Sequence, residues 1–302
     1  MTITAVDSAR HRLLNIGYRL LGSLTEAEDA VQEAYARWYA LPAERQEAVL
    51  SPDAWLTTVT SRICLDQLGS ARARRERYVG EWIPEPLPDR TEWPAGPSVA
   101  ERQDPAERIA LDESVDMALL VVLETMTPAE RVAFVLHDVF GYPFGEIGEV
   151  LERSAAACRQ LAASGRRRVR DARPDTGMTT DQARVVRAFK HAWETKDIAA
   201  LVALLDPAAT LTADGGGLVP SALHPVTGAD AIARLVLAIA DRTPGQTLRE
   251  GSVNGRPGLV ALLDGSAVTV AAFAVEDGRI TRIWAVRNPE KLGPWEAPAE
   301  AV

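Results

Sequence analysis

The stretch TPAERVAFVLHDVFGYPFGEIGEVLERSAAACRQLAASGRRRVRDAR, residues 127–173, decides how the fold of this chain is interpreted. Thr127, with Glu130 three residues later, forms a capping box that marks the start of a helix. A short helix is predicted around 144–151, and Ser154 caps a third, basic helix. A short helix, a tight turn and a basic helix in this order predict a helix-turn-helix.

The third helix carries the side chains expected to meet DNA. Its inner face is Cys158, Leu161, Gly165 and Val169, with room for close packing at Gly165. Arg159 and Gln160 are the first exposed residues, and their side chains can form bidentate hydrogen bonds with guanine and adenine. Phosphate contacts are expected further along, from Arg166, Arg167, Arg168 and Arg170. The alternative role for Arg159 is a surface ion pair. The alternative to a DNA-binding motif is a pair of helices that resembles one by chance, because the turn at 152–153 lacks the glycine often found there.

A second basic cluster lies near the end of another helical segment. Helices are predicted from 7 to about 41, with Thr25 and Glu28 as a capping box, and from Pro52 to about 77, capped by Ser51. The second of these helices is expected to bury Trp55, Val59 and Ile63 and to expose Thr58, Arg62, Asp66 and Gln67. Residues 62–77 contain five arginines and two acidic residues, a net charge of +3. Residues 154–173 contain six arginines and one acidic residue, a net charge of +5.

These clusters stand out because the whole chain is acidic, with a net charge of -9 over 302 residues. Two basic helical segments in an acidic chain favour DNA as a partner, although either alone fits a solvated helix face. The length predicts two or three compact units. No apolar run long enough to span a membrane and no signal peptide are found, so we expect a cytosolic protein. Cys64 and Cys158 are expected to be small core residues.

Residues 78–104 are predicted to be a linker, because prolines interrupt any regular element there: Pro84, Pro86, Pro88, Pro94 and Pro97. Solvated linkers seldom carry two tryptophans, yet this one holds Trp82 and Trp93 together with Ile83 and Leu87. We therefore expect the segment to dock onto a surface. The alternative is a loop packed on its own domain.

The last unit, residues 178–302, has an α+β pattern. Helices are predicted near its start and at 229–242, and a strand at 210–213. Four strand-like segments follow, at 247–254, 259–263, 267–275 and 279–286, and Asp277-Gly278 is a hairpin signal. We expect a curved antiparallel sheet. The order resembles the SnoaL-like, nuclear transport factor-like cone fold.

Roughly residues 7 to 173 resemble regions 2 and 4 of sigma-70 family proteins, specifically the two-domain extracytoplasmic-function (ECF) sigma factors. The resemblance rests on Asp29-Ala30-Val31-Gln32-Glu33-Ala34, the helix from Trp55 through Arg77, and the helix-turn-helix. It implies two all-α domains, 1–77 and 105–173, that direct promoter recognition and transcription initiation.

The resemblance also implies roles for particular residues. The surface with Asp29, Gln32 and Glu33 would dock on the clamp helices of the polymerase beta-prime subunit, and region 4 would meet the beta flap. The helix that contains the basic cluster at 62–77 would melt the promoter DNA and contact its -10 element. The residues implied in this contact are Arg62, Asp66, Gln67, Arg72, Arg74, Arg75 and Arg77. The helix after Ser154 would contact the -35 element.

Three further strings resemble ECF sigma factors with a fused SnoaL-like domain: residues 78–86 in the linker, 214–217 and 288–292. In that subgroup the fused domain is thought to regulate the sigma domains, and no separate anti-sigma factor is expected. The residues implied in this regulation are Trp82, Pro84, Glu85, Pro86, Asp214, Gly215, Gly216, Gly217, Asn288, Pro289, Lys291 and Leu292. Leu218 departs from the pattern, in which a basic residue is usual.

An enzymatic last domain is the alternative to a regulatory one. Its acid-base candidates are Asp214, His224, Asp230 and Asp264. Each of the three aspartates has a simpler interpretation as a turn or helix-start residue, so we expect no catalytic residues and no cofactor. No metal site is expected, because no second ligand lies at convincing spacing from His11, His137 or His191. A DNA-binding regulator with a ligand-sensing or enzymatic domain also remains open; unlike a sigma factor, it would not require core RNA polymerase.

Overall fold

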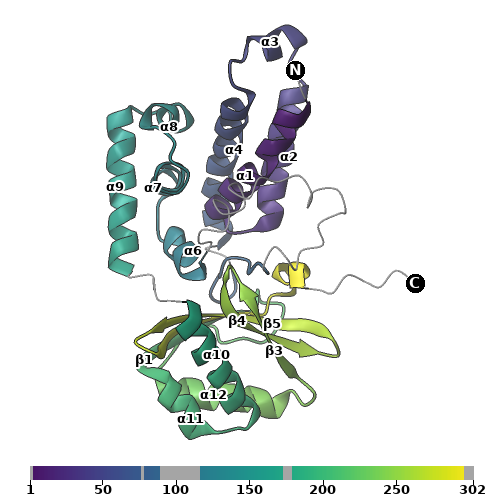
Figure 1. The fold of residues 1–302 in the computed structure, drawn as a ribbon, viewed down its shortest axis with the longest axis vertical. Coiled ribbons are helices and arrows are strands. Elements are labelled where there is room, and N and C mark those ends of the chain that lie inside the picture. Colours follow the sequence, from purple (N-terminus) through teal and green to yellow (C-terminus); the bar gives the residue numbers. More distant parts are fainter. Residues whose placement is uncertain (1–2, 76–77, 89–115, 173–178, 296–302) are drawn as a thin grey trace, which may run out of the picture. The chain divides into compact units, whose positions relative to one another are not determined.

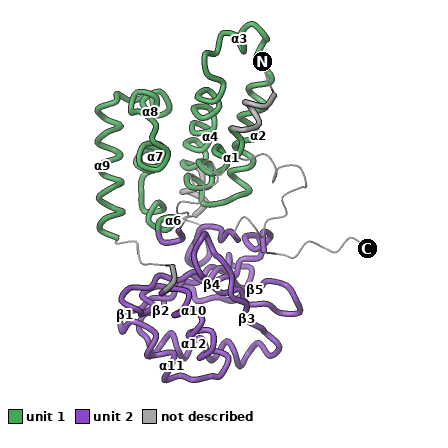
Figure 2. The backbone as a smooth tube through the Cα atoms, in the orientation of Figure 1, with its two compact units in different colours: residues 1–77, 119–173 green, residues 78–118, 174–302 purple. Residues whose placement is uncertain are grey.

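The computed structural model describes residues 3–75, 78–88, 116–172 and 179–295. The chain forms two compact units, which Figure 2 shows in different colours. Unit 1 comprises residues 1–77 and 119–173, and unit 2 comprises residues 78–118 and 174–302. The described linker residues, 78–88, therefore group with the C-terminal part of the chain.

The described part of unit 1 consists of helices joined by short loops (Figure 1). Its first part contains α1 (Ile3–Leu21), α2 (Leu24–Tyr39), α3 (Ala43–Ala48) and α4 (Pro52–Arg75). Its second part contains the end of α6 (Met117–Glu124), α7 (Pro128–Phe134), the π-helical turn η2 (Val135–Val139), α8 (Phe144–Leu151) and α9 (Ala155–Ala172). Within the residues described, every helix of the protein is too short or too polar to serve as a membrane-spanning segment.

The helix starts agree with the capping chemistry in three places and differ in one. Ser51 and Ser154 accept backbone amides of α4 and α9, and Thr127 forms the predicted capping box of α7. The prediction for α2 was wrong: Ser23, not Thr25, is its N-cap and accepts the amide of Glu26.

The buried side of α4 also differs from the prediction. Trp55 and Val59 are only half-buried, while Leu56 and Thr60 are fully buried and Ile63 is buried as predicted. The reason is that α4 packs against four other helices of unit 1, α1, α2, α7 and α8. A helix surrounded in this way has no single apolar stripe, so its sequence does not identify one buried face. Cys64 of the same helix is a buried free cysteine, as is Cys158 of α9.

The predicted order of a short helix, a tight turn and a basic helix is confirmed by α8 and α9, whereas the helix before them, α7, differs from the prediction. α7 widens into η2 after Phe134, a π turn that no sequence signal predicted. Glu152 takes the left-handed conformation, with φ of 53°, in the turn where glycine is absent. Gly165 is needed on the inner face of α9, because a Cβ there would lie 2.9 Å from the side chain of Phe134.

Unit 2 contains a six-stranded open sheet with helices on one side (Figure 1). Its helices are α10 (Thr179–Glu194), α11 (Ile198–Leu204) and α12 (Ala229–Arg242). Its strands are β1 (Leu205–Asp214), β2 (Val226–Thr227), β3 (Thr247–Val253), β4 (Arg256–Leu263), β5 (Ser266–Glu276) and β6 (Arg279–Val286). The 3-10 turns η3 (Pro289–Lys291) and η4 (Gly293–Trp295) follow.

The strand order is β2-β1-β6-β5-β4-β3. All pairs are antiparallel except β1 and β6, which run parallel and are connected by the long stretch of chain from β2 to β5. Asp277-Gly278 forms the predicted hairpin turn, with φ of 51° and 76°, the pattern of a type I′ turn. The core between helices and sheet is filled by side chains, and the ring of Phe189 from α10 lies 5.6 Å from that of Phe273 in β5.

Candidate functional site

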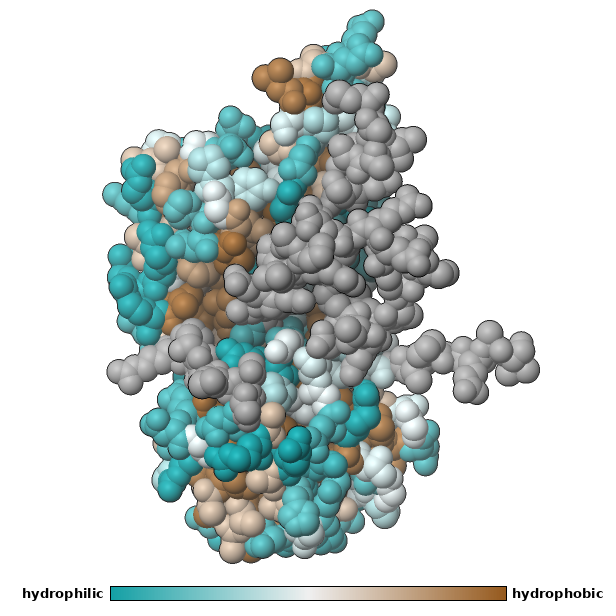
Figure 3. Space-filling view, viewed as in Figure 1, coloured by the Kyte–Doolittle hydropathy of each residue, from teal (hydrophilic) through white to brown (hydrophobic). Residues whose placement is uncertain are grey.

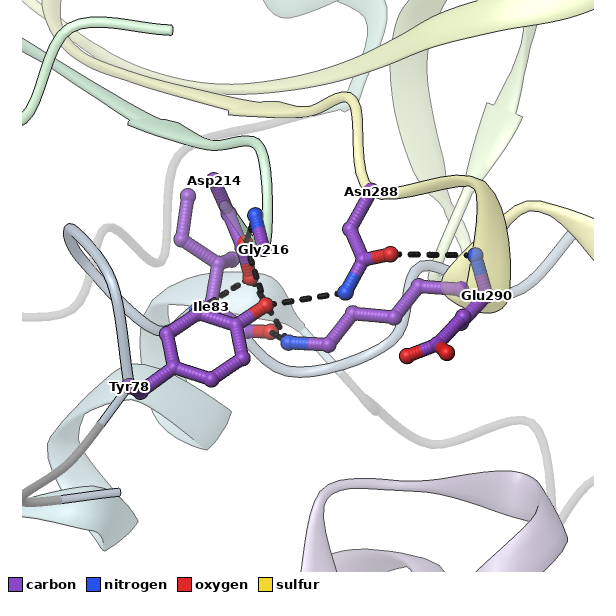
Figure 4. Close-up of polar contacts among 7 residues, drawn as sticks. Tyr78, Ile83, Asp214, Gly216, Asn288 and Glu290 are labelled. Carbon is purple, nitrogen blue, oxygen red and sulfur yellow. Dashed lines mark hydrogen bonds and ion pairs between the residues drawn. The ribbon is translucent and has the colours of Figure 1, made fainter. Parts of the chain in front are cut away.

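The last residue of β1, Asp214, lies at the centre of a polar cluster in unit 2 (Figure 4). Its side chain is fully buried. Oδ1 accepts hydrogen bonds from the hydroxyl of Tyr78, at 2.6 Å, and the amide of Gly216, at 3.0 Å. Oδ2 accepts the amide of Ile83 at 3.0 Å and the ammonium of Lys291 at 2.6 Å. Four donors, two of them from the linker, therefore converge on one carboxylate.

Lys291 connects the linker to the C-terminal segment. It is 8% exposed, and its Nζ donates both to Asp214 and to the carbonyl oxygen of Ile83, at 2.5 Å. The same Nζ lies 4.1 Å from the ring centroid of Trp82 and 5.2 Å from that of Tyr78. A buried ammonium requires such partners, because an unpaired charge in the interior is strongly unfavourable.

Tyr78 and Asn288 complete the cluster. The Tyr78 hydroxyl accepts from Nδ2 of Asn288, at 2.9 Å, while it donates to Asp214. Burial, and then the hydrogen bond to Asp214, raise the pKa of Tyr78 above its ordinary value, so the hydroxyl keeps its proton. Asn288 also caps η3, since its Oδ1 accepts the amide of Glu290.

The three glycines after Asp214 are required by close contacts. A Cβ on Gly215 would lie 2.4 Å from the carbonyl oxygen of Val219. A Cβ on Gly216, which has φ of 64°, would lie 2.5 Å from Nδ2 of Asn288. A Cβ on Gly217, with φ of 72°, would lie 2.9 Å from Val79 of the linker. Larger residues would therefore push the loop after β1 away from Asn288 and from Val79 of the linker.

The second half of the described linker is held by other residues of unit 2. Nε1 of Trp295 donates to the carbonyl oxygen of Pro86, at 2.7 Å. The side-chain oxygen of Asn254 accepts the amide of Leu87, and the amide of Asn254 donates to the Leu87 carbonyl. We call Asp214, Asn254, Asn288, Lys291 and Trp295, together with the linker residues 78–88 that they hold, the linker clasp.

The structure brings the three strings of the sequence analysis together at the clasp. Pro84, Glu85, Pro86 and Leu292 are buried beside the contacts given above, and Pro289 is exposed at the start of η3. Sequence reasoning missed Asn254 and Trp295 as clasp residues. The Asn254-Gly255 pair carries a hairpin signal that could have drawn attention to the first, whereas nothing in the sequence connects Trp295 with Pro86.

The residues of α9 expected to contact DNA lie mostly on its exposed side. Figure 3 shows a largely hydrophilic surface over this helix, at the left edge of unit 1. Arg159, Gln160, Arg167 and Arg170 are exposed. Arg166 is ion-paired with Asp138, at 2.8 Å, and Arg168 with Glu130, at 3.5 Å, so these two residues also have partners inside the motif.

Glu130 fixes α9 relative to α7. Its carboxylate accepts the Ser164 hydroxyl at 2.6 Å and the Thr127 amide at 2.9 Å. Burial alone would raise the pKa of Glu130, but the hydrogen bonds from Ser164 and Thr127 and the charge of Arg168 outweigh it and lower the pKa.

Of the residues expected near the -10 element, the structure describes the side chains of three. Arg62 and Asp66 are exposed on α4, and Gln67 is half-buried. Arg62 donates to the carbonyl oxygen of Glu149 in α8, at 2.7 Å, within unit 1. The side chains of Arg72, Arg74 and Arg75, and Arg77 as a whole, lie outside the described residues. The expected polymerase contacts Asp29, Gln32 and Glu33 are all exposed on α2.

The fold and the site together define a class: a modular protein with two helical regions, the second a helix-turn-helix of the kind that binds DNA, and an α+β domain that holds the linker between them. Models of sigma-70 region 2 and sigma-70 region 4 match residues 5–74 and 116–169. The ECF RNA polymerase sigma factor SigJ of Mycobacterium tuberculosis is 37% identical over 97% of this chain and 93% of its own length. The probable ECF sigma factor SigI of the same species is 36% identical over 95% and 93%.

The crystal structure of SigJ matches with a TM-score of 0.74 and 34% sequence identity, over 97% of this chain and 99% of that chain. The chain therefore belongs to the ECF sigma factors of the sigma-70 family. Its function is promoter recognition and transcription initiation with RNA polymerase. The expected resemblance to ECF sigma factors with a SnoaL-like domain is confirmed.

Proposed function

We propose that the C-terminal domain regulates this sigma factor in cis by holding the linker in the linker clasp. The observation that carries the proposal is the position of Lys291, which binds Asp214 and the Ile83 carbonyl at once. Releasing the linker would leave the Lys291 and Asp214 charges without their linker partners. Linker docking is therefore coupled to a buried ion pair and is not a loose surface contact.

The clasp acts on the segment that joins the two promoter-contacting regions. Between the region 2 and region 4 matches lie residues 75–115, and the clasp holds 78–88 of them. An extended chain spans at most roughly 3.3–3.6 Å per residue, so holding 11 residues removes up to about 36–40 Å of reach. Clasp opening would therefore change the separations that the two regions can adopt on a promoter.

Transcription with purified core RNA polymerase tests this proposal. Removing residues 178–302 is expected to alter output over a set of promoters, because the linker then loses every clasp partner. If the shortened protein and the full chain transcribe all promoters equally, the C-terminal domain has no regulatory role. Binding of core polymerase to both proteins is the control that keeps loss of assembly separate from loss of regulation.

We also propose the contacts with promoter and polymerase. Arg159 and Gln160 contact bases of the -35 element, while the other arginines of α9 contact phosphates. Alanine at either position is expected to weaken -35 recognition by about 1–3 kcal/mol per lost bidentate contact. Unchanged promoter selection in both variants would contradict these roles. The α2 surface with Asp29, Gln32 and Glu33 binds the beta-prime clamp helices, and region 4 binds the beta flap.

Regions 2 and 4 contact each other within unit 1. Arg62, which we place at the -10 element, is bonded to the Glu149 carbonyl of α8, and the hydroxyls of Thr57 and Tyr142 are 3.1 Å apart. The guanidinium of Arg131 donates to the Leu20 carbonyl near the end of α1. We propose that this closed arrangement of unit 1 opens when the protein binds polymerase.

The C-terminal domain is proposed to act without catalysis, metal or cofactor. Asp214, the acid that a cone-fold enzyme could use as a base, has both oxygens occupied by hydrogen-bond donors. A general base requires an acceptor oxygen directed at substrate. Because the regulatory element belongs to the chain itself, we propose that no separate anti-sigma factor is needed, and that the protein acts in the cytoplasm with polymerase.

A further inference from the structure

Three side chains form a ladder in the helix-turn-helix: His137, Phe144 and Arg159. The rings of His137 and Phe144 have centroids 3.9 Å apart and planes inclined by 30°. The guanidinium carbon of Arg159 also lies over the Phe144 ring, 5.3 Å from its centroid. η2, α8 and α9 each supply one member, so the ladder connects the three segments of the motif.

The base of the ladder is fixed by the backbone. His137 lies in the π turn η2, and its Nδ1 is 2.9 Å from the carbonyl oxygen of Tyr142. A carbonyl only accepts, so Nδ1 carries the hydrogen in this contact. The amide of Tyr142 donates to the Leu136 carbonyl, which holds the loop against the turn. π turns are frequent at functional sites, and this one presents an aromatic ring to Phe144.

The end of the ladder is the residue expected to contact a base. Arg159 is exposed near the start of α9, where a long side chain would otherwise sample many rotamers and lose that freedom on binding. The face of an aromatic ring attracts a guanidinium and restricts where it lies. The contact with Phe144 therefore favours a limited set of Arg159 conformations before DNA arrives.

We infer that Phe144 is a positioning residue that sets base discrimination at the -35 element through Arg159. The inference rests on the proposed base contact of Arg159. Phe144 need not contact DNA for this role. A positioning role predicts that changing Phe144 alters base preference at one position of the -35 element, while phosphate binding by Arg167 and Arg170 stays unchanged.

The test uses the full-length protein with core polymerase and a promoter library that carries every base at each -35 position. Arg159→Ala first identifies the position at which preference is lost. Phe144→Leu, which keeps apolar bulk without a ring, is expected to reduce preference at that same position by about 2- to 5-fold. Phe144→Tyr keeps the ring and is expected to retain the preference. Binding to non-specific DNA should match the wild type in both Phe144 variants, whereas Arg159→Ala loses the contribution of one positive charge. Thermal unfolding of Phe144→Leu measures separately the stability lost with the His137–Phe144 ring contact.

A double variant separates positioning from a general packing role. With Arg159→Ala present, Phe144→Leu should cause no further loss of preference, since the side chain it positions is absent. A further loss in the double variant, equal flattening at all positions, or an unchanged profile for Phe144→Leu would each overturn the inference. If Arg159→Ala itself flattens no position, the proposed base contact fails, and the inference fails with it.

Discussion

Replacing Asp214 by asparagine is expected to release the linker from the clasp. Each carboxylate oxygen of Asp214 accepts one backbone amide, that of Gly216 or that of Ile83. An asparagine has one oxygen, so either orientation turns its NH2 group toward a backbone N–H and loses that hydrogen bond. The ammonium of Lys291 also loses its counter-charge while it remains 8% exposed.

The expected free-energy cost of Asp214→Asn follows from the burial of the Asp214–Lys291 ion pair. Breaking a buried ion pair by removing one partner costs about 3–5 kcal/mol. At about 1.4 kcal/mol per tenfold change, linker release should become roughly 100- to 3,000-fold more frequent. The Leu87 amide reports this directly, because its acceptor Asn254 is unchanged by the substitution and hydrogen exchange at this amide requires the clasp to open.

The chain offers a matched control in the same domain. Asp241 forms an ion pair with Lys196, and both side chains are more than half exposed. Asp241→Asn makes the same chemical change in a solvated pair, for which about 0–1 kcal/mol is expected. Amides of the β5–β6 hairpin should remain protected in both variants and show that the sheet is intact. Equal exchange of the Leu87 amide in the two variants would refute the reasoning.

Three further predictions concern other parts of the molecule. Cys64, whose pKa burial raises to about 12, and Cys158, whose pKa burial also raises, should stay unreactive toward a thiol reagent at neutral pH until the protein unfolds; rapid labelling of the native chain would contradict this. The lowered pKa of Glu130 means that its stabilising contribution is complete above the unfolded value of about 4.3 and is lost as pH falls through the folded value. Unfolding temperatures should therefore be higher for the wild type than for Glu130→Gln at pH 7, with a gap that narrows toward pH 3; a constant gap argues against the assignment. Gly216→Ala should destabilise the clasp by at least ~1 kcal/mol, as measured by exchange of the linker amides, whereas Gly245→Ala, at a positive φ with open space around it, isolates the backbone strain alone and should leave those amides protected.

Features set by neighbouring residues were the ones that could be predicted from the sequence. A hydroxyl directly before a helix accepts an amide of its first turn, so Ser51, Thr127 and Ser154 were recognisable as caps, and Glu130 completes a capping box for Thr127 alone. The same signal occurs twice near the start of α2, at Ser23 and at Thr25. The helix begins at the earlier one because Gly22, with φ of 71°, ends α1 directly before it. A competing signal is resolved by the preceding element, which a local pattern does not contain.

The π turn η2 and the helices that pack against α4 could not be predicted from neighbouring residues. Nothing in the composition of residues 135–139 distinguishes η2 from a continuing α-helix, and the turn is stabilised by contacts of the following loop, such as the bond from the Gly141 amide to the His137 carbonyl. Likewise, Thr60 is buried although it is polar, because neighbouring helices enclose α4. Both features depend on tertiary packing, and periodicity in one segment does not report it.

The clasp shows why a motif can be recognised before its chemistry is understood. Asp214 and Lys291 are 77 residues apart, and Lys291 and Ile83 are 208 apart, so no local pattern indicates that they meet. Each charge alone would be unfavourable in a buried position, and each becomes acceptable only with the other present. The two strings around these residues must therefore function as a pair. A variant that replaces Asp214 by asparagine and Lys291 by methionine should lose less linker protection than the sum of the two single changes, because the second substitution removes the charge that the first leaves buried and unpaired.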